Sequence, residues 1–367
     1  MNKSIKSPRN DRVVVGAAAQ AAVLERLKRR TQGGGKLAGA CIPALAEHYI
    51  NKGIKLFEVL DRPLRGAELS TFRDMMRAKL QEGFEASPHA RFILAYHPSD
   101  ADPMSLSCTL QVLVPSLEEQ ITEWMQSTGA TQPFGKYPDA KVVEIARALH
   151  ERGSSRVLDV GAGTGRNSLA LARVGLSVTA VEPHARFAEH LRAVAVEEEL
   201  SLAVLEADVL EETTTFPGDA FDLQILSEVV THFTVSEVQK LLPRLVSALS
   251  AGGTLLFNAF VAKGGYQPDA LARQASASVW STFLTRQELE AATRSAGLEI
   301  VADEPALEYE KTHLPRDAWP KTPWYESWAQ GNNLFATTAG IAPIELCWLT
   351  CRKRPESPHG YTATQLR

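Results

Sequence analysis

The sequence predicts an α/β protein, in which residues 139–367 form a largely parallel sheet with helices on both faces. Short runs of β-forming residues alternate in this region with helical patterns, an order typical of parallel strands joined by helices. A segment with three glycines in five residues, 161–165, joins the first of these runs to a helix. Residues 1–130 lack this alternation, and the length of 367 residues corresponds to about two domains. We therefore expect residues 1–130 to form a smaller α+β accessory domain.

The composition argues against two classes of partner. Apolar residues make up 44% of the chain and charged residues 22%, which is typical of a folded globular protein. The formal net charge is −4, whereas a dedicated nucleic-acid binder usually carries a basic excess. No apolar run reaches the length of a membrane-spanning helix. We expect no nucleic-acid partner and no membrane span.

The N-terminus and the cysteines both indicate a cytoplasmic location. Residues 1–12 are polar, and we expect them to be disordered. The apolar run after them weakly resembles a secretory signal, but Gln20 interrupts it and a basic helical segment follows directly. Cys347 and Cys351 are four residues apart with no histidine nearby, which is a poor zinc signal. We expect buried, reduced thiols and no metal site.

The N-terminal region contains helical and strand patterns but no catalytic motif. Helices are expected over residues 13–30 and 39–51 and in the segment ELSTFRDMMRAKLQEGF. The segments RFILAYHP and SLSCTLQVLVP predict two strands. Ser116 with Glu119 forms the capping box of a further helix. Residues 128–138 are rich in turn formers and indicate a linker.

The second region repeats strand and helix in turn. A helix, DAKVVEIARAL, opens it, and the last two strands are expected at about 298–309 and in IELCWLTCRK. Between these two strands, residues 311–343 form an aromatic-rich insertion. The strands expected before the insertion are RVLDV, SVTAVE, LAVLEA, FDLQIL and TLLFNAF. In such sheets ligands bind at the carboxyl ends of the strands, so functional residues should lie just after a strand.

The spacing of the glycines in this loop argues against a dinucleotide site. Dinucleotide sites have G-x-G-x-x-G, which would place the third glycine at position 166. Arg166 stands there, and the glycines are Gly161, Gly163 and Gly165, preceded by Asp159. We expect Arg166 to be an exposed helix residue. The loop, D-x-G-x-G-x-G after a strand, resembles the first motif of class I S-adenosylmethionine-dependent methyltransferases.

This resemblance implies a Rossmann-like sheet of seven strands with the last one antiparallel. It implies S-adenosyl-L-methionine as the methyl donor and S-adenosyl-L-homocysteine as the product. Asp159 would order the loop or meet the methionine ammonium, and Glu182 would accept hydrogen bonds from the ribose. Asp208 would contact the adenine amine, with the Val209 N–H near a ring nitrogen. The residues implied to bind the cofactor are Asp159, Gly161, Ala162, Gly163, Gly165, Asn167, Glu182, Pro183, Asp208, Val209, Ser227 and Tyr137.

Part of the core resembles one branch of this family more closely. The strings GAGTGRNSLALARVGLSVTAVE and STFLTRQEL are similar to the tellurite-resistance methyltransferases, over roughly residues 156–297. The acceptor is then either a small organic metabolite or a chalcogen oxyanion such as tellurite or selenite. A non-catalytic cofactor-binding protein and a protein methyltransferase are the competing functions. The oligomeric state is open, with a homodimer as one option.

Two residues after the fourth strand are candidates for catalysis. Glu228 and His232 are four positions apart and would share a face if the turn is helical. His232 is the better candidate base because histidine titrates near neutral pH. The alternative is a histidine that only packs locally, with Glu228 bound to the methionine ammonium.

The C-terminal part supplies candidate substrate contacts. Its aromatic side chains either line an acceptor site or form the core of a lid. The candidates are Trp280, Phe283, Arg286, His313, Trp324 and Tyr325.

Overall fold

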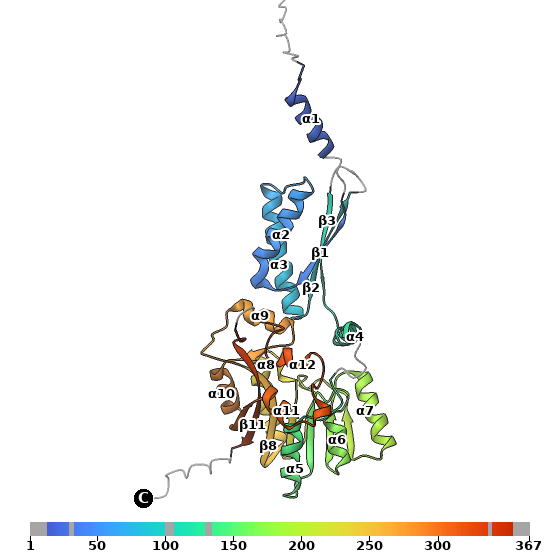
Figure 1. Cartoon of the computed structure of the whole chain (residues 1–367), viewed down its shortest axis with the longest axis vertical. Coiled ribbons are helices and arrows are strands. Elements are labelled where there is room, and N and C mark those ends of the chain that lie inside the picture. The colour runs from blue at the N-terminus through green and yellow to red at the C-terminus, as the bar shows by residue number, and fades with distance from the viewer. Residues whose placement is uncertain (1–12, 29–32, 100–105, 129–133, 337–339, 355–367) are drawn as a thin grey trace, which may run out of the picture. The chain divides into compact units, whose positions relative to one another are not determined.

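The computed structural model describes residues 13–28, 33–99, 106–128, 134–336 and 340–354. The chain divides into two units, Met1–Val114 and Pro115–Arg367. The sequence-based boundary near residue 130 differs from this division, because the helix α4 (Leu117–Thr128) belongs to the second unit. Figure 1 shows the helices and strands of both units.

The first unit consists of a three-stranded antiparallel sheet and helices. Its elements are α1 (Ala17–Lys28), β1 (Gly35–Ala40), η1 (Pro43–Leu45), α2 (Ala46–Val59), α3 (Ala67–Ala86), β2 (Arg91–Pro98) and β3 (Leu106–Leu113). The strand order is β1-β2-β3. Phe92 and Leu94 of β2 are fully buried and belong to one core with Met76 and Leu80 of α3. Alternate residues of β2 therefore face the helices, as expected for a sheet covered on one side.

One element of the first unit differs from the sequence-based expectation. The helix expected over 39–51 is replaced by β1 up to Ala40 and by α2 from Ala46. The segment GKLAGA has few β-forming residues, but it pairs with β2 along its whole length. Pairing with a neighbouring strand here outweighs the weak local preference.

The second unit is built around the predicted sheet. Its remaining elements before the aromatic insertion are α5 (Ala140–His150), β4 (Arg156–Val160), α6 (Ser168–Arg173), β5 (Ser177–Val181), α7 (Ala185–Glu197), β6 (Leu202–Leu205), β7 (Phe221–Leu226), η2 (Val230–His232), α8 (Val235–Ala248), β8 (Leu249–Ala262), α9 (Ala270–Ser278), β9 (Phe283–Leu284), α10 (Arg286–Ser295) and β10 (Leu298–Pro305). The elements from the insertion onward are α11 (Ala306–His313), η3 (Arg316–Ala318), α12 (Tyr325–Ala329) and β11 (Ile344–Lys353).

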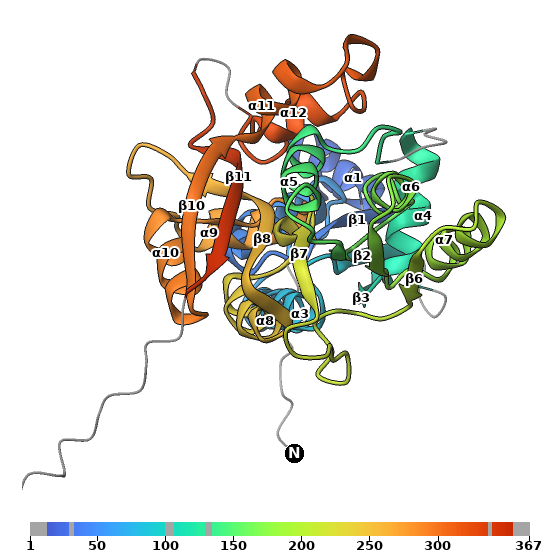
Figure 2. The same ribbon diagram turned by 90° about the horizontal axis from the view of Figure 1, so that it is seen from below.

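The strand order confirms the predicted sheet. It reads β10-β11-β8-β7-β4-β5-β6, with the two-residue strand β9 paired to β8 outside this path. The strands from β8 to β6 are parallel, and β11 runs antiparallel to both β8 and β10. Helices lie on both faces of the sheet (Figure 2). The last strand is therefore antiparallel, inserted between β8 and β10.

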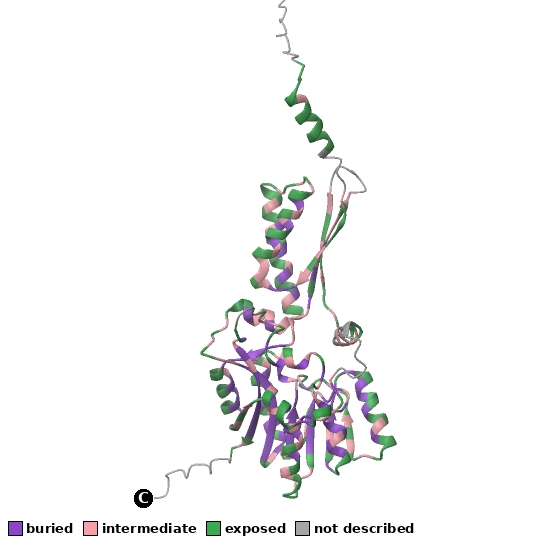
Figure 3. Cartoon of the chain, in the orientation of Figure 1, coloured by how far each residue is buried: buried purple, intermediate pink, exposed green. Residues whose placement is uncertain are grey.

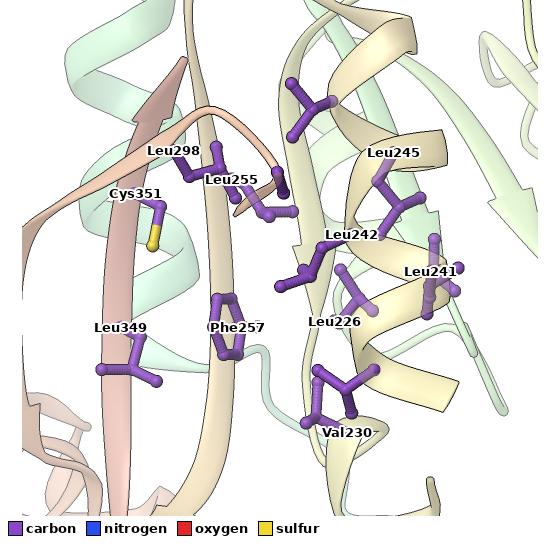
Figure 4. Packing of buried hydrophobic residues seen from close by; sticks show 14 of the residues in the cluster. Leu226, Val230, Leu241, Leu242, Leu245, Leu255, Phe257, Leu298, Leu349 and Cys351 are labelled. Atoms are coloured by element: carbon purple, nitrogen blue, oxygen red, sulfur yellow. The ribbon is translucent and has the colours of Figure 1, made fainter. Parts of the chain in front are cut away.

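Two hydrophobic cores hold the helices against this sheet. On one face, α8 contributes Leu241 and Leu245 to a cluster with Phe257 of β8 and Leu349 of β11 (Figure 4). The other face carries a second cluster, which includes residues of α5, α11 and α12. The strands at the centre are buried along most of their length (Figure 3). This rigid sheet fixes the positions of the loops that follow β4, β5, β6 and β7.

Candidate functional site: a buried charge cluster beside the glycine loop

The loop between β4 and α6 has the backbone conformation for which glycine is suited. Gly161, Gly163 and Gly165 have φ angles of 70°, 56° and 89°, in the region that L-residues rarely adopt. A Cβ atom at Gly161 would lie 2.4 Å from Cγ2 of Val229, and one at Gly163 would lie 3.1 Å from Cδ2 of Phe134. The loop therefore lies against the turn after β7 on one side and against the segment before α5 on the other.

Asp159, the acid that precedes the glycines, is buried at the end of β4. Its carboxylate accepts a hydrogen bond from the hydroxyl of Ser168 in the first turn of α6. Burial raises the pKa of this carboxyl to about 6, against the lowering effects of Ser168 and Arg166. Asp159 thus links the strand to the helix across the loop, which is one of the two roles that the resemblance implied.

Glu182, after β5, is also buried and holds the same loop. Its carboxylate accepts hydrogen bonds from the N–H of Gly163 at 2.7 Å and from the N–H of His184 at 2.8 Å. Burial raises its pKa, and these two backbone hydrogen bonds lower it only in part. Because each carboxylate oxygen has a second lone pair, the side chain retains acceptor capacity for a ligand hydroxyl.

The other residues predicted for the adenosine side lie at the same edge of the sheet. Pro183 is exposed beside Glu182. Asp208 is exposed after β6, and its carboxylate accepts a hydrogen bond from the Leu210 N–H at 2.8 Å. Val209 is buried at 5% exposure. Ala162 lies inside the glycine loop and is also buried.

Four charged side chains meet on the other side of the loop, and we call Asp139, Arg166, Glu228 and Lys321 the charge cluster. Arg166 donates to Glu228 at 2.8 Å, and Lys321 donates to the same carboxylate oxygen at 2.7 Å. Both cations also donate to Asp139. Their side chains are only 0% to 11% exposed. Two negative and two positive charges cancel, so the cluster is neutral overall.

The expectation that Arg166 is an exposed helix residue was wrong. Helix α6 begins at Ser168, so Arg166 belongs to the loop and its side chain turns inward, with 6% exposure. Asp139 and Glu228 raise its pKa above the ordinary value, although burial acts in the opposite direction. A buried guanidinium between two carboxylates is stable because its partners compensate the loss of hydration.

Polar neighbours complete the shell around Asp139. The hydroxyl of Ser227 donates to its carboxylate at 2.6 Å, and the amide of Asn167 donates at 3.0 Å. The Asp139 N–H in turn donates to the Asn167 side chain at 2.9 Å. Burial alone would raise the pKa of Asp139, but Arg166 and Lys321 outweigh burial and hold it below its usual range. Asn167 and Ser227 thus bond directly to the charge cluster at Asp139.

The backbone at Glu228 is strained. Its φ angle is 62°, which a non-glycine residue adopts only where the surrounding structure enforces it. The Glu228 N–H donates to Oδ1 of Asn258 on β8 at 2.6 Å. This contact holds the turn after β7 in the conformation that brings the carboxylate to Arg166 and Lys321.

The structure separates the two catalytic candidates. Glu228 lies in the charge cluster, whereas His232 is exposed at the end of η2. The His232 ring lies 5.9 Å from the Trp280 ring, centroid to centroid. Trp280 has a positive φ of 51° and is half-buried. These two rings therefore pack on each other, and His232 is exposed, whereas the Glu228 side chain is only 11% exposed.

Among the other substrate candidates, Tyr325 contacts the cluster. The Lys321 Nζ lies 4.2 Å from the centroid of its ring, and Tyr325 is fully buried. The ring of Trp324 lies 6.2 Å from that of Tyr325. Aromatic side chains of the insertion thus reach the cluster through Tyr325.

The remaining three candidates do not join them. Phe283 belongs to β9 and is fully buried in the core. Arg286 is exposed and paired with Asp303. His313 is exposed and stacks on Tyr309, with 4.1 Å between ring centroids. Core packing and surface pairing account for these three side chains.

Tyr137 joins the segment before α5 to the aromatic insertion. Its hydroxyl donates to Asp317 at 2.9 Å. A Cβ atom at Gly135 would lie 2.9 Å from the carbonyl oxygen of Lys321. The two segments therefore run side by side next to the charge cluster, with Tyr137 at the edge of the site.

Sequence reasoning missed Asp139, Lys321 and Asn258. Asp139 stands directly before a helix, a position typical of a helix cap. Lys321 lies 182 positions from Asp139 in the sequence, so no local pattern connects them. Asn258 lies within an apolar strand, where a single polar residue is the one available signal. A polar residue at a buried position within a strand of the sheet is unusual, and this would have been a reason to include Asn258.

Known proteins similar to this chain include methyltransferases. Residues 157–253 match the model of a family described as a methyltransferase domain. A search of curated proteins finds no match. No helix in the described part of the chain is long and apolar enough to cross a membrane.

Three solved structures illustrate the similarity of fold. The cyclase SpnF has 19% identity, with coverage of 66% of this chain and 97% of its own and a TM-score of 0.44. An O-methyltransferase of a trans-AT polyketide synthase multienzyme from Brevibacillus brevis, in complex with S-adenosyl-L-homocysteine, has 17% identity, 65% and 78% coverage and a TM-score of 0.45. The geranyl diphosphate C-methyltransferase from Streptomyces coelicolor has 17% identity, 57% and 78% coverage and a TM-score of 0.42.

The order of the strands and the position of the matched residues, which run from β4 into β8, lead to one assignment. The second unit has a Rossmann-like methyltransferase fold, and its residues 157–253 match a methyltransferase domain. The chain is therefore assigned as an enzyme whose cofactor is S-adenosylmethionine.

Proposed function

We propose that this enzyme transfers the methyl group of S-adenosylmethionine to a small organic acceptor that binds next to the charge cluster. The observation that carries the proposal is the cluster itself, a neutral set of four buried charges at the carboxyl ends of the strands. It borders the glycine loop at Arg166 and the turn after β7 at Glu228. Methyl transfer depends largely on positioning the two reactants, and rigid buried groups suit that task.

The residues of the cluster fit the methionine part of the cofactor. That part carries an ammonium and a carboxylate, and the cluster offers groups of both signs. Glu228 would hold the ammonium, and Arg166 would hold the carboxylate, since a guanidinium matches carboxylate geometry. The Ser227 and Asn167 side chains, which donate to Asp139, would keep its carboxylate in place.

The residues after β5 and β6 fit the adenosine part. Glu182 would hold the ribose and Asp208 the adenine amine, with Val209, Pro183 and the loop residues beside them. His184 supports this placement. It is 5% exposed and stacks on Phe187, and both of its ring nitrogens lack a hydrogen-bond partner among the described residues. A buried imidazole of this kind is expected to bond to a ligand or to water.

S-adenosylmethionine supplies an activated methyl group, and the chain's own residues supply position and charge. Glu228 is fixed by Arg166, Lys321 and Asn258. His232, being exposed, would need a movement of its turn to act as a base on a buried acceptor. We therefore favour an acceptor that enters already ionised, or one that is nucleophilic without losing a proton.

The test is turnover of S-adenosylmethionine with a fractionated cell extract. We expect release of S-adenosyl-L-homocysteine, measured by mass spectrometry, with the low-molecular-weight fraction and not with the macromolecular fraction. Methylation in the macromolecular fraction would indicate a protein substrate instead. Turnover with tellurite or selenite alone would favour the chalcogen branch that the sequence resembles. Cofactor binding without turnover in any fraction would indicate a regulatory protein.

A further inference from the structure

Two polar side chains beside the charge cluster are buried and incompletely hydrogen-bonded. Asn258 on β8 and Tyr325 on α12 are both 0% exposed. Within the described part of the chain, Nδ2 of Asn258 and Oη of Tyr325 have no hydrogen-bond partner. Buried polar atoms are almost always satisfied in folded proteins. These two atoms therefore indicate a ligand that completes their bonding.

The orientation of the Asn258 amide is fixed by its neighbour. The Glu228 backbone N–H is a donor, and it lies 2.6 Å from the atom assigned as Oδ1. An amide turned the other way would place its NH₂ group against this N–H, donor against donor. The end of the Asn258 amide that lacks a partner among the described residues is thus its NH₂ group, a pure donor.

The Tyr325 hydroxyl is a second donor. Burial raises the pKa of Tyr325 well above its ordinary value, and Glu228, Glu310 and Asp139 add to this effect. The phenol therefore keeps its proton at neutral pH. Its ring lies 4.2 Å from the ammonium of Lys321, which itself donates to Glu228. Asn258 and Tyr325 are thus each one contact away from the Lys321–Glu228 pair.

Lys321 adds a third donor to this group. An ammonium has three N–H bonds, and Lys321 uses two of them, toward Asp139 and Glu228. The remaining N–H, the Asn258 NH₂ group and the Tyr325 O–H offer donors and no fixed acceptor. A carboxylate, with two oxygens and about four lone-pair sites, matches such a set.

The charge of the site points to a monoanion. The charge cluster sums to zero, from −1 and −1 at Asp139 and Glu228 and +1 and +1 at Arg166 and Lys321. Bound S-adenosylmethionine would bring one further positive charge, that of the sulfonium. A monoanionic acceptor would compensate the sulfonium charge, whereas a dianion such as a phosphate monoester would exceed it, and the buried carboxyl of Glu310, which acts on Tyr325, disfavours a dianion further.

We propose that Asn258, Tyr325 and Lys321 bind the carboxylate of the methyl acceptor, which is therefore a small organic acid. This inference rests on the proposed methyltransferase function and names the substrate class of that same site. Asn258 and Tyr325 are substrate-binding residues, and Glu228 positions Asn258 through its backbone N–H.

The experiment uses the full chain saturated with S-adenosyl-L-homocysteine. Binding of acetate and benzoate, two carboxylate probes of different size, is measured by calorimetry. Benzyl alcohol and inorganic phosphate are measured beside them. We expect at least one carboxylate to bind and both other probes to bind more weakly.

Two variants assign the binding to these side chains. Asn258→Asp keeps an acceptor for the Glu228 N–H but replaces the donor end, and Tyr325→Phe removes only the hydroxyl. Each should weaken carboxylate binding by roughly tenfold or more, and Tyr325→Phe should leave the affinity for S-adenosyl-L-homocysteine unchanged. Tyr266→Phe, which removes a hydroxyl from a tyrosine packed on Phe283 and Phe335, should leave carboxylate binding unchanged and serves as the control.

The outcomes separate this inference from the proposed function. If S-adenosyl-L-homocysteine does not bind, the proposed function fails and this inference fails with it. If the cofactor product binds but neither carboxylate does, or if both variants bind the carboxylate as the wild type does, only the inference is overturned. Tighter binding of phosphate than of either carboxylate would also overturn it. If a buried water, and not a carboxylate, bonds to Asn258 and Tyr325, neither carboxylate probe will bind.

Discussion

Replacing Arg166 by methionine tests whether the charge cluster is a buried, mutually compensating set. The substitution removes hydrogen bonds to Asp139, Ser227 and Glu228. Lys321 continues to bond to both carboxylates, so two buried negative charges would face one positive charge. Removing one partner of a buried ion pair typically costs about 3–5 kcal/mol, and we expect a loss of that order in the free energy of unfolding.

The assay is urea unfolding at pH 7, followed by tryptophan fluorescence. All six tryptophans lie in the second unit, so the signal reports on the unit that contains the cluster. The matched control is Arg173→Met, because Arg173 is paired with Glu198 in a similar way but at the surface, with side-chain exposures of 49% and 37%. Exposed pairs contribute little to stability, so this variant should unfold close to the wild type.

A double variant tests whether the loss of stability comes from the unbalanced charge. Glu228→Gln added to Arg166→Met restores the charge balance, so the double variant should be more stable than the sum of the two single losses predicts. Equal destabilisation by Arg166→Met and Arg173→Met would refute the reasoning. So would strict additivity of the double variant.

Two further predictions concern titration and thiol reactivity. The pKa of Asp159 in the folded protein is about 6, above its unfolded value near 3.8. The protonated Asp159 carboxyl therefore contributes fully to stability below pH 4, and this contribution is lost as the pH rises through 6. The free energy of unfolding of Asp159→Asn should therefore rise relative to that of the wild type between pH 4 and pH 7, by an amount on the order of 3 kcal/mol. Unfolding curves recorded across this pH range measure the difference, and a difference that does not change with pH would contradict the prediction. Cys41, Cys347 and Cys351 are buried, and burial raises their pKa values to about 11, 12 and 12. Partial burial also raises the pKa of Cys108, but this thiol is exposed and therefore accessible to a reagent. One thiol should react rapidly with a disulfide reagent in the native protein at pH 8, and none in Cys108→Ser; fast reaction of a second thiol would show that the packing is looser than described.

The sequence predicts those parts of the fold that depend on local patterns. The strands β4, β5, β7 and β8 are rich in apolar and β-branched residues, and the glycine spacing 161–165 identifies the loop after the first of them. The buried carboxylates Asp159 and Glu182 follow directly from their positions at strand ends. These features need no knowledge of distant contacts.

Other features depend on contacts between remote segments. The inward position of Arg166 requires Asp139 and Glu228, which lie 27 and 62 positions away. Lys321 has no distinguishing neighbours in the sequence and reaches the cluster because the insertion returns over the strand ends. Phe283 was predicted to contact substrate as an aromatic residue near the insertion, but the short strand β9 pairs with β8 and buries it. Polar and aromatic identity alone does not distinguish such core residues from site residues.

The most direct test of the central claim, that the cofactor lies against the glycine loop, is the affinity for S-adenosyl-L-homocysteine measured by calorimetry on two alanine variants. Gly163 and Gly175 both have positive φ angles, 56° and 90°, so alanine is strained at either position. A Cβ atom at Gly163 would face the loop surface near Phe134, whereas one at Gly175 would meet no atom within 4 Å. The account predicts that Gly163→Ala weakens binding by roughly tenfold or more while Gly175→Ala binds as the wild type does. Unchanged affinity in Gly163→Ala would contradict the placement of the site.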